Sequence, residues 1–285
     1  MGVVTRRVKW LASLGLVATL GIGSATVLAP SASAKARPRH HVHTTPLVST
    51  APVTSASFSF TASVSGLTKS LGTIGVSGSG AVDLVNDAAS LSVTLPASVA
   101  ALIPGGSSGP EVVNVVLSGG TIYVQVPSLA TLLGAPWISI ALPSSANSAL
   151  PGILTTVGGA LGDVNEILSF AQSHHAKVTS LGSSTVDSTS VTGSQVSAHV
   201  KGLKLAATLW ANSSDQLVQA DVTGSFGGAK HGAGISAVVN FSDYDAPVVI
   251  TVPSSSEVRA IPLSVVTSVL GGLLHSAHFG HGAKI

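Results

Sequence analysis

The sequence predicts an α+β fold in which a strongly curved antiparallel sheet carries helices on its concave face. Segments of alternating apolar and polar residues are separated by short turns rich in Asn, Asp or Gly, which is typical of hairpins. Only residues 163–176 have the clear 3.6-residue apolar period of a helix. The 285 residues are 45% hydrophobic but only 4% aromatic and 8% charged, so small and β-branched side chains dominate. This pattern disfavours a parallel βαβ architecture.

Residues 1–34 have the organisation of a signal peptide. A basic start, MGVVTRRVKW, precedes an apolar run interrupted by glycine, and Ala32 and Ala34 match the small residues that signal peptidase requires. We expect cleavage after Ala34 and export; a retained membrane anchor is the alternative. The chain has no Cys, which excludes disulfides, a thiolate zinc site and a lipid-accepting Cys after the leader.

Residues 35–56 mix Pro, Thr and Ser with a few basic residues and are predicted to be a disordered linker. Their basic start could contact an anionic envelope surface, or it could be an ordinary solvated tail. From residue 40 onward the chain has 7 basic and 11 acidic residues, so the body is mildly acidic. We therefore expect no nucleic-acid partner.

Residues 57–256 are predicted to form one domain, and residues 257–285 a short helix with a His/Gly tail. Two half-sheets of similar organisation are expected, joined through the helix at 163–176. The segments 97–104 and 127–134 are weaker helix candidates because Pro or Gly bounds them. The predicted strands cover residues 58–64, 76–84, 90–96, 112–118, 121–127, 137–143, 191–200, 203–210, 216–226, 234–241 and 247–253.

The helix at 163–176 begins with Asp163 and Glu166, which have the spacing of a capping box. Its apolar residues then recur at the spacing of one helical face, with polar residues opposite. One side of this helix should therefore be covered by other parts of the protein. The apolar stripe consists of Val164, Ile167, Leu168 and Ala171.

The stretch VSGSGAVDL at 76–84 has two glycines on the face that alternation assigns to the interior. Glycine permits a sheet to curl, and two missing side chains also leave volume. We interpret this as one wall of an apolar ligand cavity; a bulge, or close packing beneath a helix, is the alternative. The predicted lining is Val76, Gly78, Gly80, Val82, Leu84, Val93, Val115, Val124, Ile167 and Leu168.

Several stretches in order, SGSGAVDLV, GGTIYVQVP, PWISIAL, TLWANSSDQLVQADVT and FSDYDAPVVITVP, resemble the actinobacterial LppX/LprG family of exported envelope proteins. The resemblance covers residues 55–256. It implies a LolA/LolB-like half-barrel with helices lining its concave side, and a cavity for acyl chains of envelope lipids. Members usually carry a lipobox Cys, where this chain has Ala34-Lys35, so no lipid anchor is expected.

These features together predict a non-catalytic protein that binds or carries a lipid or another apolar molecule in the cell envelope. The alternative is a structural or adhesive wall protein with a solid core. An enzyme is disfavoured because the letters GGSSG at 105–109 lie in a loop between prolines, without the strand of a nucleophile elbow. The histidines at 275, 278 and 281 could bind a metal loosely or belong to a plain tail; no metal and no cofactor is predicted.

Overall fold

The computed structural model describes residues 53–66, 72–103, 105–106, 108–200, 203–226 and 233–264. They belong to the compact unit Pro52–Ile285. The predicted leader, nearly all of the linker and the histidine tract lie outside these residues.

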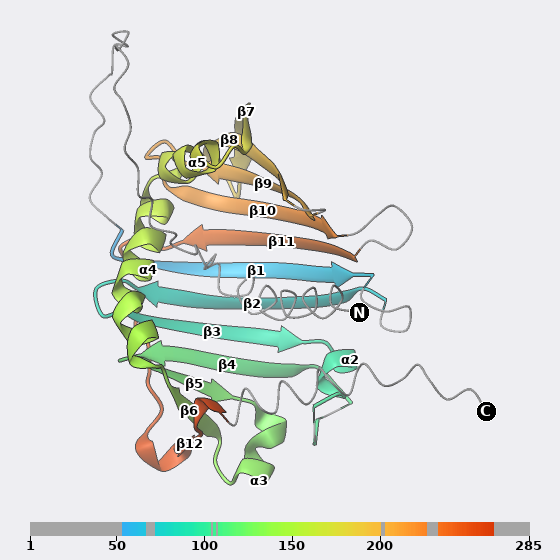
Figure 1. The fold of residues 1–285 in the computed structure, drawn as a ribbon, viewed down its shortest axis with the longest axis vertical. Helices are drawn as coiled ribbons and strands as arrows, with labels where there is room; N and C mark the ends of the chain where they lie inside the picture. Colours follow the sequence, from blue (N-terminus) through green and yellow to red (C-terminus); the bar gives the residue numbers. More distant parts are fainter. Residues whose placement is uncertain are drawn as a thin grey trace, which may run out of the picture. The chain divides into compact units, whose positions relative to one another are not determined.

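The described residues form an α+β fold dominated by one sheet of twelve strands, with the order β12-β6-β5-β4-β3-β2-β1-β11-β10-β9-β8-β7 (Figure 1). Every pairing is antiparallel except β12 with β6, which is parallel. The sheet is open, with β12 and β7 at its edges. The strands are β1 Ser55–Ser65, β2 Ile74–Asp83, β3 Ala88–Leu95, β4 Glu111–Ser118, β5 Thr121–Gln125, β6 Trp137–Ala141, β7 Lys177–Val186, β8 Thr189–Val200, β9 Leu203–Ala211, β10 Leu217–Phe226, β11 Ala233–Ser242 and β12 Val258–Ala260.

The strands fall into two groups on either side of β1. Strands β2 to β6 follow one another on one side, and β7 to β11 do so on the other. Gly119 and Gly120, both with positive φ, make the tight turn between β4 and β5 that the sequence predicts. The two predicted half-sheets are therefore present, but as parts of one continuous sheet.

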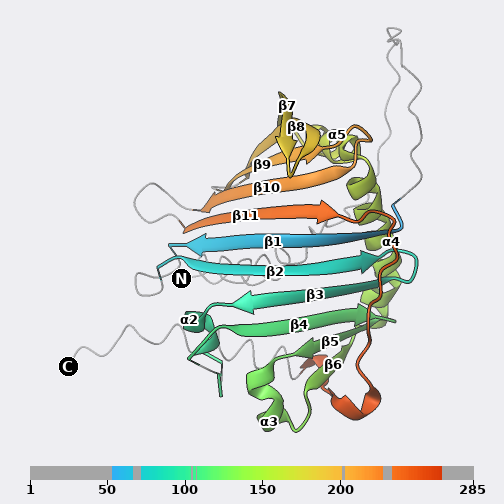
Figure 2. The ribbon, with the colours of Figure 1, turned by 180° about the vertical axis from the view of Figure 1, so that it is seen from behind.

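The helices are concentrated between β6 and β7 in the sequence. The longest, α4, crosses the sheet at one end of the strands, and α5 follows it (Figures 1 and 2). Among the described residues, no helix has the length and hydropathy that crossing a membrane requires. The helices are α2 Ala97–Ala100, α3 Ala130–Leu133, α4 Ser144–Gly162 and α5 Val164–Ser173, with short 3₁₀ turns at η1 Pro127–Leu129 and η2 Ser255–Glu257.

Strand alternation gives the sheet two unlike faces. On β1, Phe58 and Phe60 share one face, while Ser57, Ser59 and Thr61 lie on the other. The cross-strand register extends this division: Phe60 pairs with Val239 on one side, and Ser59 pairs with Asn240. We call these the apolar face and the polar face.

The predicted helix at 163–176 is confirmed as α5, and its apolar stripe is turned inward: Val164 is buried, whereas Asn165 on the polar side is exposed. The capping box is only half present. The Asp163 carboxylate accepts a hydrogen bond from the Asn165 N–H at 2.8 Å. The Asp163 N–H instead donates to the Gly159 carbonyl at 2.8 Å, because Asp163 also ends α4. Glu166 therefore cannot close the box.

Helix α4 and strand β7 have no counterpart among the elements predicted from the sequence. The α4 segment contains Pro151 and several glycines, which are poor helix formers. Packing stabilises α4 instead: Leu150, Leu154 and Leu161 are buried along one side. Strand β7 reads KVTSLGSSTV, is exposed at most positions and has a register irregularity between Ser180 and Gly182, so it lacks a clear alternation.

The predicted strand at 247–253 is wrong, because the structure has no regular element there. It follows β11, which already pairs with β10 and β1, so no neighbouring edge is open to it. Proline at both of its ends also removes backbone donors. Val249 is 88% exposed. The chain continues to β12, three residues that pair in parallel with β6 at the edge of the sheet.

Candidate functional site

The middle of the apolar face carries a compact group of apolar side chains, which we call the central patch. Phe60, Leu91 and Val93 are its most buried members, at 5%, 5% and 8% exposure. The described residues that pack against them all come from strands β1 to β4 and β11. The patch consists of Phe58, Phe60, Ala62, Val76, Leu91, Val93, Leu95, Val115 and Val239.

Two of the three glycines of β2, Gly78 and Gly80, lie inside this patch, directly opposite the two phenylalanines of β1. Phe60 pairs with Gly78 and Phe58 with Gly80. A Cβ at Gly78 would lie 2.7 Å from Cε1 of Phe60, and one at Gly80 would lie 2.6 Å from Cζ of Phe58. The aromatic rings therefore occupy the space that the missing side chains leave, an arrangement known for glycine in sheets as aromatic rescue.

The same device recurs in the other half of the sheet. Gly193 pairs with Trp210, whose ring would overlap a Cβ at that glycine. Gly224 pairs with Ile235, whose Cγ1 would lie 2.7 Å from a Cβ. Four strand glycines thus make room for a large side chain on the neighbouring strand, a role outside the alternatives predicted from the sequence; they are Gly78, Gly80, Gly193 and Gly224.

One end of the apolar face is covered by α4 and α5, and we call this region the helix-covered cluster. Leu161 of α4 and Val164 of α5 are buried there against Leu209 and Leu217 of the sheet. Gly158 lets α4 approach closely, since a Cβ there would lie 2.6 Å from Leu84 Cδ1. The buried members are Ala56, Leu161, Val164, Leu209, Ala211 and Leu217, and Val82, Ile167, Leu168 and Tyr244 are among those packed against them.

Tyr244 closes this cluster at the end of β11. Its hydroxyl donates a hydrogen bond to the Leu217 carbonyl, and burial raises the pKa of the Tyr244 hydroxyl above its ordinary value. Nearby, the Asp245 carboxylate accepts hydrogen bonds from the Thr54 N–H at 2.7 Å and from the Thr54 hydroxyl at 2.9 Å. Asp243 and Asp245 both have positive φ, a conformation that Asp tolerates in turns.

The ten residues predicted to line a cavity divide between these regions. Val76, Val93 and Val115 belong to the central patch. Val82, Ile167 and Leu168 pack on the helix-covered cluster, and Leu84 contacts α4. Val124 extends the apolar face to β5, where it pairs with Val115. Gly78 and Gly80 lie beneath the phenylalanines. That these residues line a ligand cavity stays a prediction.

Six patch members were not among the predicted residues and lie beside them: Phe58, Phe60, Ala62, Leu91, Leu95 and Val239. Alternation alone assigns them to the same face of their strands. Their proximity follows from the order β3-β2-β1-β11, which joins the second strand group to the first. A sequence without long-range pairing information could not supply that order.

A buried carboxylate that was not predicted from the sequence lies at the start of β4. Glu111 is 6% exposed, and its Oε1 accepts a hydrogen bond from the Ser128 N–H at 2.7 Å. This contact ties the 3₁₀ turn η1 to β4. Within the described residues, no three side chains of His, Cys, Asp or Glu gather as a metal site would require.

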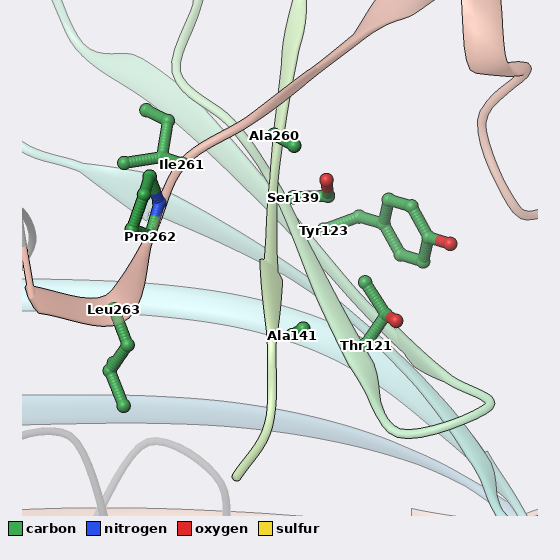
Figure 3. A pocket seen from close by; sticks show the side chains of 8 residues that line it. All are labelled: Thr121, Tyr123, Ser139, Ala141, Ala260, Ile261, Pro262 and Leu263. Atoms are coloured by element: carbon green, nitrogen blue, oxygen red, sulfur yellow. The ribbon is translucent and has the colours of Figure 1, made fainter.

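A shallow pocket lies at the β12 edge of the sheet, on the polar face (Figure 3). Its volume is about 470 Å³. Thr121 and Tyr123 of β5 and Ser139 of β6 supply hydroxyl groups, and Ala141, Ala260 and the segment Ile261–Leu263 complete the lining. None of the ten residues predicted as cavity lining contributes to this pocket.

Comparisons with known proteins give distant structural likenesses only. No family model matches the chain, and no curated protein matches it either. The crystal structure of the lipoprotein LppX from Mycobacterium tuberculosis is similar with a TM-score of 0.37 and 16% identity, over 70% of this chain and 90% of LppX. A putative outer membrane lipoprotein-sorting protein domain from Vibrio parahaemolyticus is similar with a TM-score of 0.24 and 7% identity, over 68% of this chain and 87% of the domain. With identities and TM-scores this low, membership of the LppX/LprG family stays a prediction.

Proposed function

We propose that this protein is a non-catalytic binding or carrier protein that takes up a lipid or another apolar molecule on the central patch. The observation that supports the proposal is the unequal cover of the apolar face. Helices α4 and α5 pack on the helix-covered cluster at one end of the strands. Within the described residues, the apolar side chains that pack on the central patch come from strands alone.

The chemistry of the patch suits an acyl chain. All of its members are apolar, so binding needs no charged clamp. Each methylene group that leaves water contributes about 0.8 kcal/mol, and a chain of ten or more such groups would bind through that term alone. In this proposal the sheet curls around the ligand, and the phenylalanine rings over Gly78 and Gly80 form a smooth wall.

The setting we propose is the cell envelope outside the cytoplasm. The predicted leader supplies export, and the absence of Cys leaves no site for a lipid anchor. The basic start of residues 35–56 would then contact an anionic envelope surface. If it is only a solvated tail, the protein would be released from the cell.

A second candidate function is a structural or adhesive wall protein with a solid interior. The contacts at Gly78 and Gly80 favour it, because Phe58 and Phe60 fill part of the volume that the glycines provide. The carrier and the structural protein differ in one property, namely whether the protein binds a lipid or another apolar molecule.

Extraction of the purified protein with organic solvent, followed by mass spectrometry, tests the proposal. A carrier should release a stoichiometric lipid, and the extracted protein should then bind a fluorescent fatty acid. A protein that releases no lipid and rejects the fatty acid would overturn the carrier function and favour the structural role.

A further inference from the structure

The polar face carries a continuous row of uncharged hydrogen-bonding side chains across the sheet, which we call the polar row. It follows the cross-strand register from β10 to β5, one residue per strand. Trp210 on β9 and Trp137 on β6 pair with its two ends. The members in spatial order are Gln219, Asn240, Ser59, Ser79, Ser92, Asn114 and Gln125.

The row is long and accessible. Ser59 and Ser79 at its middle are exposed, and its amide members are half-buried. Helices α4 and α5 pack on the opposite face, through the helix-covered cluster (Figure 2). With neighbouring strands about 4.8 Å apart, the path from Trp210 to Trp137 measures roughly 38 Å along the sheet. A partner that uses the whole row must therefore be an extended chain.

The chemistry of the row selects an uncharged partner. No member carries a charge, and Ser, Asn and Gln each offer both donors and acceptors. The carboxylate of Asp221 lies beside the row, and its two oxygens accept hydrogen bonds from Trp210 Nε1 at 3.3 Å and Gln219 Nε2 at 2.7 Å. Nucleic acids and acidic polymers need cationic side chains, which the row lacks.

The pocket at the β12 edge continues this surface at one end. Tyr123 and Ser139, which line it, form the cross-strand pair next to Gln125 and Trp137. Tyr123 supplies an aromatic ring there, and Thr121, Tyr123 and Ser139 supply hydroxyl groups, whereas the side chains of Ile261 and Leu263 extend away from Tyr123 (Figure 3). A sugar ring matches such a site, because it has apolar C–H faces and a rim of hydroxyl groups. The volume of about 470 Å³ is within the usual range of small-ligand pockets.

We infer that the polar face binds a strand of uncharged polysaccharide along the polar row, with one sugar residue seated in the pocket. This activity is independent of the apolar ligand, because the two lie on opposite faces of one sheet. Both could be occupied at once, which would place a lipid-binding protein on a glycan surface.

Affinity electrophoresis of the full chain tests the inference. Native gels would contain hydroxyethyl cellulose, galactomannan or pullulan as neutral polysaccharides, and heparin as a polyanion. We expect at least one neutral polysaccharide to retard the protein and heparin not to. Ser79→Lys should weaken that binding by about tenfold or more, since it places a bulky charge in the row.

Ser236→Lys is the matched control, because Ser236 is an exposed serine of the same face. It lies on β11 four residues from Asn240, about 13 Å along the strand. It should leave the mobility shift unchanged. Tyr123→Phe, which keeps the ring and removes the hydroxyl, should weaken binding by a smaller factor.

Two outcomes would overturn the inference. One is that no neutral polysaccharide retards the wild type more than serum albumin, which would make the polar face a merely solvated surface. The other is that Ser79→Lys and Ser236→Lys bind equally well. Fluorescent fatty-acid binding by both variants, measured in parallel, reports the fold and the apolar site separately from the glycan result.

Discussion

Two regions of the same apolar face differ in what packs on them. In the helix-covered cluster, Leu161 of α4 meets sheet residues such as Leu209 from a second layer. In the central patch, Leu91 is equally buried, yet the described side chains around it belong to strands. Similar burial therefore arises in different ways: from a two-layer core in one region, and from neighbouring strands in the region that we propose binds the ligand.

The largest expected effect is on the free energy of unfolding, when a buried leucine in either region is replaced by alanine. Leu161→Ala should lower the free energy of unfolding by about 2–5 kcal/mol, because a closed cavity remains between helix and sheet. Leu91→Ala should cost less, since ligand or solvent can fill the space it leaves. Urea unfolding of both variants, without lipid, measures the difference. Equal losses would show that the central patch is a solid core and would remove the contrast.

A charge placed on either face of β4 sharpens the comparison. Val115→Glu puts a carboxylate in the central patch and should weaken fatty-acid binding by roughly a hundredfold, about 2.7 kcal/mol. Val112→Glu, on the opposite face and 43% exposed, should leave binding unchanged. Titration with a fluorescent fatty acid gives both affinities, and circular dichroism verifies that each variant folds. Equal affinities for the two variants would place the ligand elsewhere.

Two glycines of β2 test the packing of the aromatic rings. Gly78→Ala should destabilise the protein by about 1–3 kcal/mol, because the added Cβ meets the Phe60 ring and the Ser92 carbonyl. Gly75→Ala is the matched control: nothing lies within 4 Å of a Cβ there, and the change should be neutral or slightly stabilising. Thermal unfolding measures both. If Gly78→Ala is also neutral, the rings do not occupy that space in solution.

The smallest expected effect is a change in stability caused by a substitution in the turn after β2. The Asp83 carboxylate accepts hydrogen bonds from the Asn86 side chain at 2.7 Å and from two backbone N–H groups, and these bonds lower its pKa below the ordinary 3.8. The resulting stability is present above the ordinary pKa and is lost as pH falls through the lowered one. Asp83→Asn should cost less than about 1 kcal/mol at pH 7, since the group is largely exposed.

Stability measured from pH 7 down to pH 2 tests this contribution. The deficit of Asp83→Asn should shrink as the wild-type carboxyl becomes protonated. A deficit that stays constant across this range would show that ionisation of Asp83 contributes nothing.

The sequence predicted most strands and the faces of their side chains, because local alternation carries that information. It also predicted α5, whose apolar period is regular. It did not predict α4, because Pro151 and Gly158 obscure the helical pattern. Gly158 is needed for close packing of α4 against Leu84, and this contact cannot be read from the local sequence. The role of Gly78 depended on its register with Phe60, which no local pattern contains.

Photo-crosslinking with a diazirine-labelled fatty acid tests the central claim most directly. The account predicts that mass spectrometry will locate the label on strands β1 to β4, at central-patch residues such as Phe60, Leu91 and Val115. Label confined to the polar face or to exposed residues of α4, or no saturable labelling at all, would contradict the assignment of the central patch as a lipid site.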